Sequence, residues 1–469
     1  MQDTGAQAPA TLDEDDARLE HLGYHPQLNR VLGLFANFSV AFTYLSPMVG
    51  IFSLFVLGLG TAGPAYIWLT WIPVAGMLLV ALVFGELASH YPVAGALYQY
   101  SKYTVGRRFG WFVGWFYGVA LLVTVAAVDT GVVAYVTALG KLWLGWNLDP
   151  TNHLVILVVT LTLLALQTSL NIIGARTMGR VAKFGVIVEI LGTFGVAVVL
   201  GLHGFHHGLG FLTSTLGAEH ASANLTVQNG GIPYIFSQLP HGLQDVLLIL
   251  IIFAFFSCGS SVQGAGSRLA FSYARDGALP RSKWISEVSA RFKTPANALF
   301  GGALITVVFI GLEFASPTHD VKIWFITWPA NTNVLVSLVS FGVSGIYLSF
   351  LLTVIGSMIA RARGWVPAGK FTMGRWAWPV SVVAVVYLAL MLVNVVLPSG
   401  LGSGRAYFNL DWITLLVMAV VTVAGIIVYL AAHGGRAISA HMIDTGAPGY
   451  RPPAEDAAPP DAATLKEAP

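Results

Sequence analysis

The chain has 469 residues, of which 56% are hydrophobic and only 10% are charged, and its formal net charge is +2. A water-soluble domain carries far more charge on its surface, so this composition excludes an ordinary soluble protein. The sequence has no basic stripe that would bind nucleic acid. Its single cysteine, Cys258, excludes an internal disulfide and a thiolate metal cluster. We therefore expect an all-α polytopic membrane helical bundle whose surroundings are the lipid bilayer.

The apolar residues form blocks of roughly 20 or more, the length a helix needs to cross about 30 Å of hydrocarbon at about 1.5 Å per residue. The pattern predicts ten spans, at residues 31–57, 64–85, 109–140, 153–173, 181–202, 243–267, 297–316, 333–359, 377–397 and 411–432. Residues 1–30 are polar and acidic, without the apolar core of a signal peptide. The expected organisation is an N-terminal cytoplasmic segment (1–30), a transmembrane domain (31–436) and a disordered cytoplasmic tail (437–469).

The basic residues predict the orientation of the bundle. With the ten predicted spans, 21 of the 24 Lys and Arg residues fall on one side, and only Lys141, Lys322 and Arg405 fall on the other. Cytoplasmic loops of membrane proteins accumulate Lys and Arg. We expect both termini in the cytoplasm and the protein in a plasma or inner membrane.

The first predicted span contains a helix-breaking sequence near mid-membrane. Its relevant residues are Thr43, Ser46, Pro47, Met48, Val49 and Gly50. Proline removes a backbone donor, and glycine permits irregular backbone. Two interpretations are open: a simple proline kink, or a discontinuous helix. In a discontinuous helix, the N–H groups at the start of the second half would receive a substrate carboxylate, and the freed carbonyls would hold an ammonium or another cation.

Two acidic residues lie deep within predicted spans, Asp129 in the third and Glu189 in the fifth. Charge at membrane depth is costly, so such residues usually face a cavity or a partner. Each carboxyl could carry a proton or attract a substrate amine, and each could equally be a buried, hydrogen-bonded acid. No phosphate-binding loop, zinc-protease helix or nucleophile elbow occurs on a plausible element, so we expect neither an enzyme nor a resident cofactor or metal.

Three stretches resemble the amino acid–polyamine–organocation permease superfamily, in particular its amino acid/choline/GABA permease branch. The first is HLGY at 21–24 and LNR at 28–30, leading into FSV at 38–40 and LSPMVGI at 45–51. The second is FGELASHYPVAGALY at 84–98, and the third is SRLAFSYARDGALP at 267–280. The similarity extends from about residue 20 to 435 and favours the discontinuous helix over the kink.

The resemblance implies a leucine-transporter-like fold: two inverted five-helix repeats, each opened by an unwound helix, and two further helices. In that family the signature ending in Arg-Asp-Gly-Ala-Leu-Pro follows the eighth span, whereas here it follows the sixth. About ten helices are thus expected instead of twelve, with the family's sixth and seventh spans missing between His203 and Gly242. The rival interpretation is a complete five-plus-five fold, in which 257–266 forms the break that opens the second repeat.

The resemblance also implies roles for particular residues. Thr43, Ser46, Pro47, Met48, Val49 and Gly50 would bind substrate at the unwound segment. Ser257, Ser260 and Ser261 would lie where sodium-coupled relatives bind a cation. Sodium or proton coupling is therefore expected, and the residues that could carry a proton are Asp129 and Glu189. Serines in membrane helices also often bond only to their own backbone. Glu86, Arg268, Arg275 and Asp276 would shape the cytoplasmic gate.

The expected function is secondary active transport of amino acids or related amines, such as GABA, choline or polyamines, by alternating access. The alternative is a shortened, non-transporting permease variant or a regulatory membrane protein. The substrate, the coupling ion and the oligomeric state are left open by the sequence.

Overall fold

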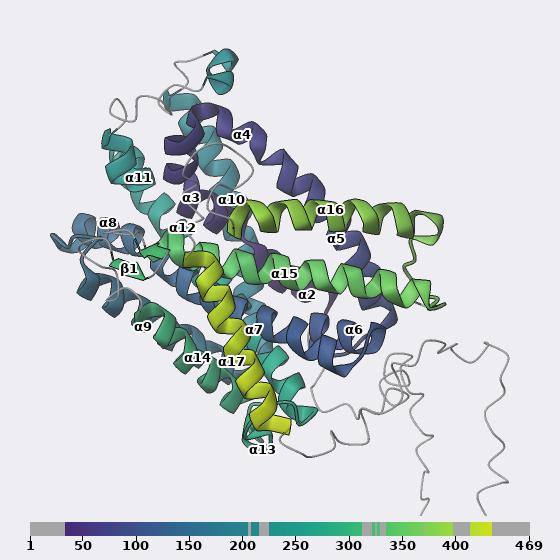
Figure 1. The fold of residues 1–469 in the computed structure, drawn as a ribbon. Coiled ribbons are helices and arrows are strands. Elements are labelled where there is room, and N and C mark those ends of the chain that lie inside the picture. The colour runs from purple at the N-terminus through teal and green to yellow at the C-terminus, as the bar shows by residue number, and fades with distance from the viewer. Residues whose placement is uncertain are drawn as a thin grey trace, which may run out of the picture.

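The computed structural model describes residues 33–204, 208–214, 225–311, 321–323, 326–328, 334–367, 369–396 and 413–433. These residues are almost entirely helical (Figure 1). The first half contains α2 (Leu34–Leu45), α3 (Pro47–Ala62), η1 (Gly63–Ala65), α4 (Tyr66–Leu69), α5 (Trp71–His90), α6 (Ala96–Thr104), α7 (Arg107–Gly131), α8 (Val133–Leu144), α9 (His153–Ile173), α10 (Ala175–Gly204) and η2 (Leu209–Thr213). The second half contains α11 (Leu225–Ser237), α12 (His241–Arg275), α13 (Ser282–Ile285), α14 (Ala296–Ile310), α15 (Val334–Ala362), η5 (Gly374–Trp376), α16 (Ala377–Val396) and α17 (Ile413–His433).

Nine helical segments of the described residues are long and apolar enough to cross a membrane, which confirms the all-α polytopic bundle. They coincide with nine of the ten predicted spans. The other predicted span, 297–316, coincides with α14, which has 15 residues and ends at Ile310. The predicted cytoplasmic segment 1–30 and tail 437–469 lie outside the described residues.

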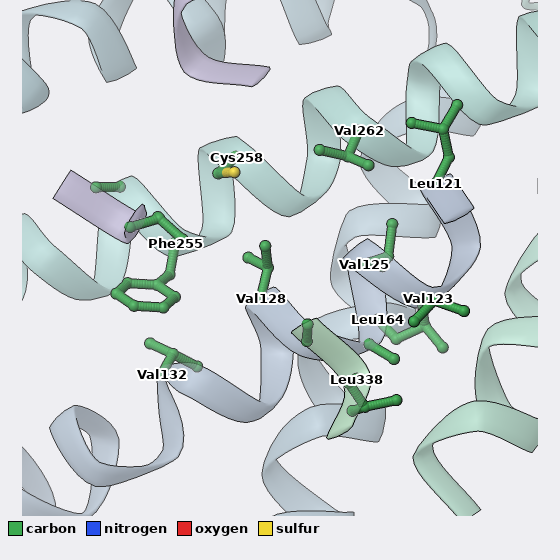
Figure 2. Close-up of a cluster of buried hydrophobic side chains, with 14 of the residues drawn as sticks. Leu121, Val123, Val125, Val128, Val132, Leu164, Phe255, Cys258, Val262 and Leu338 are labelled. Atoms are coloured by element: carbon green, nitrogen blue, oxygen red, sulfur yellow. The ribbon is translucent and has the colours of Figure 1, made fainter. Parts of the chain in front are cut away.

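The centre of the bundle is formed by α7 and α12, which pack against each other, with α15 along α7. In the apolar stretch of the span that contains α7, 67% of the residues are buried, and in that of α12 61% are buried. In the apolar stretch of α17 only 6% are buried. Figure 2 shows the core around α12, where Cys258 and Phe255 lie near Val128 and Val132. Residues on α7 and α12 therefore sit farthest from lipid.

The helix α12 settles one alternative left open by the sequence. It is a single helix of 35 residues from His241 to Arg275, and it runs through 257–266 without interruption. The five-plus-five interpretation, which needed a break at 257–266, is therefore wrong. The small residues there allow close helix packing instead.

A helix that the hydrophobic pattern did not predict, α11, lies just before α12. It has 13 residues, too few to cross a bilayer, and it is kinked: Gly231 has φ 57° and ψ −152°, and Pro233 follows within the helix. It packs against α3, α8 and α12.

The helices α15 and α16 are neighbours in Figure 1, and α5 packs against α16. Just after the C-terminal ends of α5 and α15, the rings of Tyr91 and Trp365 are stacked with their centroids 6.2 Å apart. A two-stranded antiparallel hairpin, β1 (Val321–Ile323) and β2 (Ile326–Trp328), is the sheet among the described residues and was not predicted.

Candidate functional site

The first span is interrupted at Ser46, between α2 and α3. Ser46 is buried and has φ 35° and ψ 87°, a left-handed backbone conformation that residues other than glycine rarely adopt. Its N–H still donates to the carbonyl of Phe42 (2.9 Å), and its hydroxyl accepts from the N–H of Val49 (3.3 Å) as a helix cap. Pro47 fits the first position of α3 because its missing N–H is not needed there. The local sequence thus makes two helices meet at a buried corner, instead of one kinked helix.

The carboxyl of Glu189, from the middle of α10, lies at the start of α3. One oxygen accepts the hydroxyl of Ser46, and the other accepts the N–H of Met48 (3.2 Å). Glu189 is 1% exposed. The positive end of α3, where the sequence suggested that a substrate carboxylate would bind, therefore already holds a carboxyl of the protein.

Three hydroxyl residues gather where α2, α10 and α12 meet; we call Thr43, Ser257 and Ser261 the hydroxyl cluster. The hydroxyls of Thr43 and Ser261 are hydrogen-bonded (2.9 Å). The Ser257 hydroxyl is buried and has no hydrogen-bond partner among the described residues. A methyl group at Gly185 of α10 would lie 2.8 Å from the Thr43 methyl and closer still to the Ser257 hydroxyl, so Gly185 lets the three helices approach here. Gly185 is one helical turn from Glu189, on the same face of α10.

The fourth predicted serine, Ser260, is placed differently. Its hydroxyl donates to the carbonyl of Phe256 in its own helix (2.8 Å). Ser260 is therefore a membrane serine that bonds to its own helix backbone, and it does not face the hydroxyl cluster with a free hydroxyl.

Predicted substrate residues around the break divide into two groups. Met48 and Val49 are buried, and Met48 packs against Gly192, where a methyl group would lie 2.6 Å from its sulfur. Pro47 and Gly50 have exposed positions, and a side chain at Gly50 would meet no atom within 4 Å. A larger side chain at Gly50 would therefore point away from the buried side of the break and would not block it.

Asp129, on α7, pairs with a residue that the sequence analysis did not identify. The amide nitrogen of Gln167, on α9, donates to one oxygen of Asp129 (2.7 Å). The other oxygen of Asp129 and the amide oxygen of Gln167 have no partner in the described part of the chain, and both side chains are buried. Gly259 of α12 passes so close that a methyl group there would lie 2.9 Å from the Gln167 amide carbon.

A second polar group closes one end of the bundle; we call Asp276, Tyr98, Gln99 and Lys102 the Asp276 cluster. Asp276, just after α12, accepts from the Tyr98 hydroxyl (2.8 Å), the Gln99 amide (3.2 Å) and the Lys102 ammonium (2.9 Å). Arg275 lies 3.8 Å from the same carboxylate. Burial lowers the pKa of Lys102 below its ordinary value of 10.5, and the charge of Asp276 acts in the opposite direction. The short helix α6 is thereby fixed to the end of α12.

The other predicted gate residues do not join this cluster. Glu86, on α5, pairs with Arg361 at the end of α15 and accepts the N–H of Met373 (3.0 Å). Arg268 lies two helical turns before the end of α12. The structure thus brings Arg275 and Asp276 together, and it places Glu86 and Arg268 elsewhere.

Several of these residues could not have been identified from the sequence. Gln167, Lys102 and Arg361 contact residues 38, 174 and 275 positions away, so no local pattern marks them. Gln167 carried the one available signal, because it is an amide in the middle of an apolar span.

Comparison with known proteins agrees with this architecture. The amino acid permease family model matches residues 32–243 and 221–424. Amino-acid permease BAT1 of Arabidopsis thaliana is 23% identical over 82% of this chain and 89% of its own length. An uncharacterized amino-acid permease (C74.04) of Schizosaccharomyces pombe is 26% identical over 89% and 86%, and a putative polyamine transporter of Candida albicans is 26% identical over 37% and 28%. The chain is therefore a multi-pass membrane protein that belongs to the amino acid permease family.

Proposed function

We propose that this protein is a secondary active transporter of amino acids or related amines, such as GABA, choline or polyamines, working by alternating access. The observation that carries the proposal is the break at Ser46, a buried corner inside a membrane span whose strained backbone and capped helix start have no role in merely crossing a bilayer. The relatives are named as amino-acid permeases and as a polyamine transporter, which supports the same class of solute.

The substrate site of this proposal is the buried side of the break, formed by Thr43, Ser46, Met48 and Val49, with Glu189 and the hydroxyl cluster beside it. Pro47 and Gly50 would shape the backbone without touching substrate. The inverted-repeat arrangement stays a prediction from the resemblance.

Proton coupling is proposed for Asp129. An ionised carboxylate only accepts hydrogen bonds, and one oxygen of Asp129 has no donor. A proton on that oxygen would give the carboxyl a hydrogen to donate, and the Gln167 amide oxygen is an acceptor without a donor in the same pair. Glu189 has a donor on each oxygen and needs no proton to satisfy its hydrogen bonds.

The inner gate is proposed to lie at the end of the bundle that carries the Asp276 cluster and the Glu86–Arg361 pair. Most Lys and Arg residues lie on that side of the predicted spans, which supports a cytoplasmic position for it and for both termini. Opening toward the cytoplasm would require α6 to separate from the end of α12.

The test is uptake by purified protein in proteoliposomes. A labelled panel of GABA, choline, putrescine, arginine, glutamate and leucine is offered with and without proton and sodium gradients. Saturable accumulation of one compound is expected, and its loss without a proton gradient would support Asp129. Ser46→Ala should reduce that uptake at least about tenfold, whereas Ser39→Ala, whose hydroxyl bonds only to the Phe35 carbonyl (2.6 Å), is the matched control.

The alternative is a shortened permease that does not transport alone, and two findings favour it. The alignment with BAT1 has 476 positions, more than the whole chain, yet it covers only 82% of the chain, so the relative carries segments without a counterpart here. The two family-model matches also overlap at residues 221–243, where the short α11 lies. Absence of uptake by well-folded protein, restored by grafting a relative's sixth and seventh spans after about residue 224, would establish this alternative.

A further inference from the structure

The position that suits a substrate carboxylate is already taken. Both oxygens of Glu189 accept hydrogen bonds, from the Ser46 hydroxyl and the Met48 N–H, at the positive end of α3. Donors to each oxygen and a helix N-terminus favour the ionised form of this carboxyl, whereas its burial away from water opposes that form, so a cation bound beside Glu189 would stabilise the charge. A substrate carboxylate brought to the same place would find these donors already bonded to Glu189. It would also be repelled by the negative charge of Glu189, and this repulsion is strong in a site shielded from water.

The groups beside Glu189 also suit a cation. The Ser257 hydroxyl is 1% exposed, has no partner among the described residues, and points toward Gly185, one turn of α10 from Glu189. A hydroxyl oxygen with two lone pairs can accept a hydrogen bond from an N–H group. Glu189 and Ser257 therefore offer oxygen acceptors on two helices that meet beside the break.

No basic side chain of the described residues enters this region to balance Glu189. The helices α2 and α3 carry no charged residue. On α10, Lys183 is exposed. On α12, Arg268 lies seven residues beyond Ser261, about 10 Å along the helix. Asp129, another buried ionisable residue in a membrane-spanning helix, is also an acid and offers no positive charge.

We propose that the solute recognised beside the break is an organic amine without a carboxylate, whose ammonium binds Glu189 and the Ser257 hydroxyl. This inference rests on the proposed function, and it narrows the solute from amino acids and amines to amines. An ammonium has three N–H donors and can exchange with the Ser46 hydroxyl or add to it on Glu189. A diamine fits better than an amino acid of the same length, because its other end adds no negative charge.

Putrescine and GABA test this directly, since both have a four-carbon skeleton with a terminal amine and only GABA has a carboxylate. Equilibrium binding of labelled putrescine to the purified native chain is measured and competed with unlabelled putrescine or GABA, and uptake is measured in parallel. Putrescine is expected to compete at least about tenfold better than GABA. Equal or better competition by GABA, or binding of labelled GABA without binding of putrescine, would overturn the inference while leaving a carrier of amino acids in place. Putrescine binding without any uptake would support the inference and refute transport.

Two pairs of variants locate the site. Glu189→Gln should weaken putrescine binding at least about tenfold and leave GABA binding unchanged or stronger, whereas Glu287→Gln, at an exposed loop position, should change neither. If Glu189→Gln does not fold, Gly185→Ala provides the same test, because its methyl group would enter the space between Ser257 and Thr43. Its control is Gly195→Ala on the same helix, where a methyl group meets no atom within 4 Å. Native putrescine affinity in Gly185→Ala would place the ammonium elsewhere.

Discussion

Asp276→Asn is the most informative single change at the proposed inner gate. The carboxylate joins the end of α12 to three residues of α6, and Lys102 and Asp276 are 5% and 3% exposed. Asparagine keeps the size of the side chain and one carbonyl oxygen, but it removes the charge. The buried ammonium of Lys102 then loses the carboxylate of Asp276 as a partner.

The expected loss follows from these contacts. Removing one partner of a buried ion pair costs about 3–5 kcal/mol. The remaining carbonyl of asparagine recovers about 1–2 kcal/mol as a neutral hydrogen bond. A net loss of about 2–3 kcal/mol from the closed state corresponds to about 30- to 150-fold more of the open state, because each 1.4 kcal/mol is about tenfold.

Cys258 provides the assay without any engineered label. It is the chain's single cysteine, it is 3% exposed, and it lies on α12 beside the hydroxyl cluster. A maleimide can reach its thiol only when the bundle opens, so the alkylation rate measures the open population. Asp276→Asn should raise this rate at least about tenfold. Asp245→Asn, near the other end of α12 where the carboxylate accepts the Trp143 indole (2.8 Å), should leave it within about twofold of native.

An unchanged alkylation rate in folded Asp276→Asn would refute the inference that this cluster holds the bundle closed. Equal acceleration in both variants would point to general destabilisation instead of a gate. A double-mutant cycle with Lys102→Met separates the ion pair from the other two hydrogen bonds.

Further predictions concern the buried pair Asp129–Gln167 and Lys102 of the Asp276 cluster. Asp129→Asn should abolish accumulation driven by a proton gradient while exchange of labelled for unlabelled solute continues; accumulation that persists would exclude Asp129 as the proton carrier. Gly259→Ala should cost about 1–3 kcal/mol by overpacking against Gln167 and lower the melting temperature in detergent, whereas Gly266→Ala, with its nearest neighbour at 3.8 Å, should not; equal effects would contradict the close packing. Burial lowers the pKa of Lys102, so between that lowered pKa and 10.5 the unfolded chain binds more protons than the folded chain. The contribution of Lys102 to the free energy of unfolding should therefore rise with pH across this interval. Melting curves of native protein and Lys102→Met across that alkaline interval measure the difference in slope, and identical slopes would contradict it.

Local features of the sequence determined the class of this protein and the position of its break. Hydrophobic blocks predict spans because each helix must satisfy its own backbone in lipid, whatever its neighbours. Ser46-Pro47 marks the place where the helix is disturbed, since proline removes a donor there, and the resemblance to the permease superfamily favoured a break over a kink. Nine of the ten predicted spans and the break at Ser46 are present in the described residues, and no tertiary contact was needed to expect them. α11 escaped prediction because 13 residues with an internal glycine and proline give no span-length signal.

The tertiary structure alone decided what each polar residue does. Glu189 and Asp129 are similar as buried acids in the sequence, yet one has donors on both oxygens at the start of α3 and the other has an oxygen without a partner beside Gln167. Likewise, 257–266 reads as a possible break, but the small residues let α12 pass close to α9 and α10 as one unbroken helix. Partners of this kind lie tens to hundreds of positions apart, and hydropathy cannot specify them because it records how much each residue avoids water and not which residue it meets.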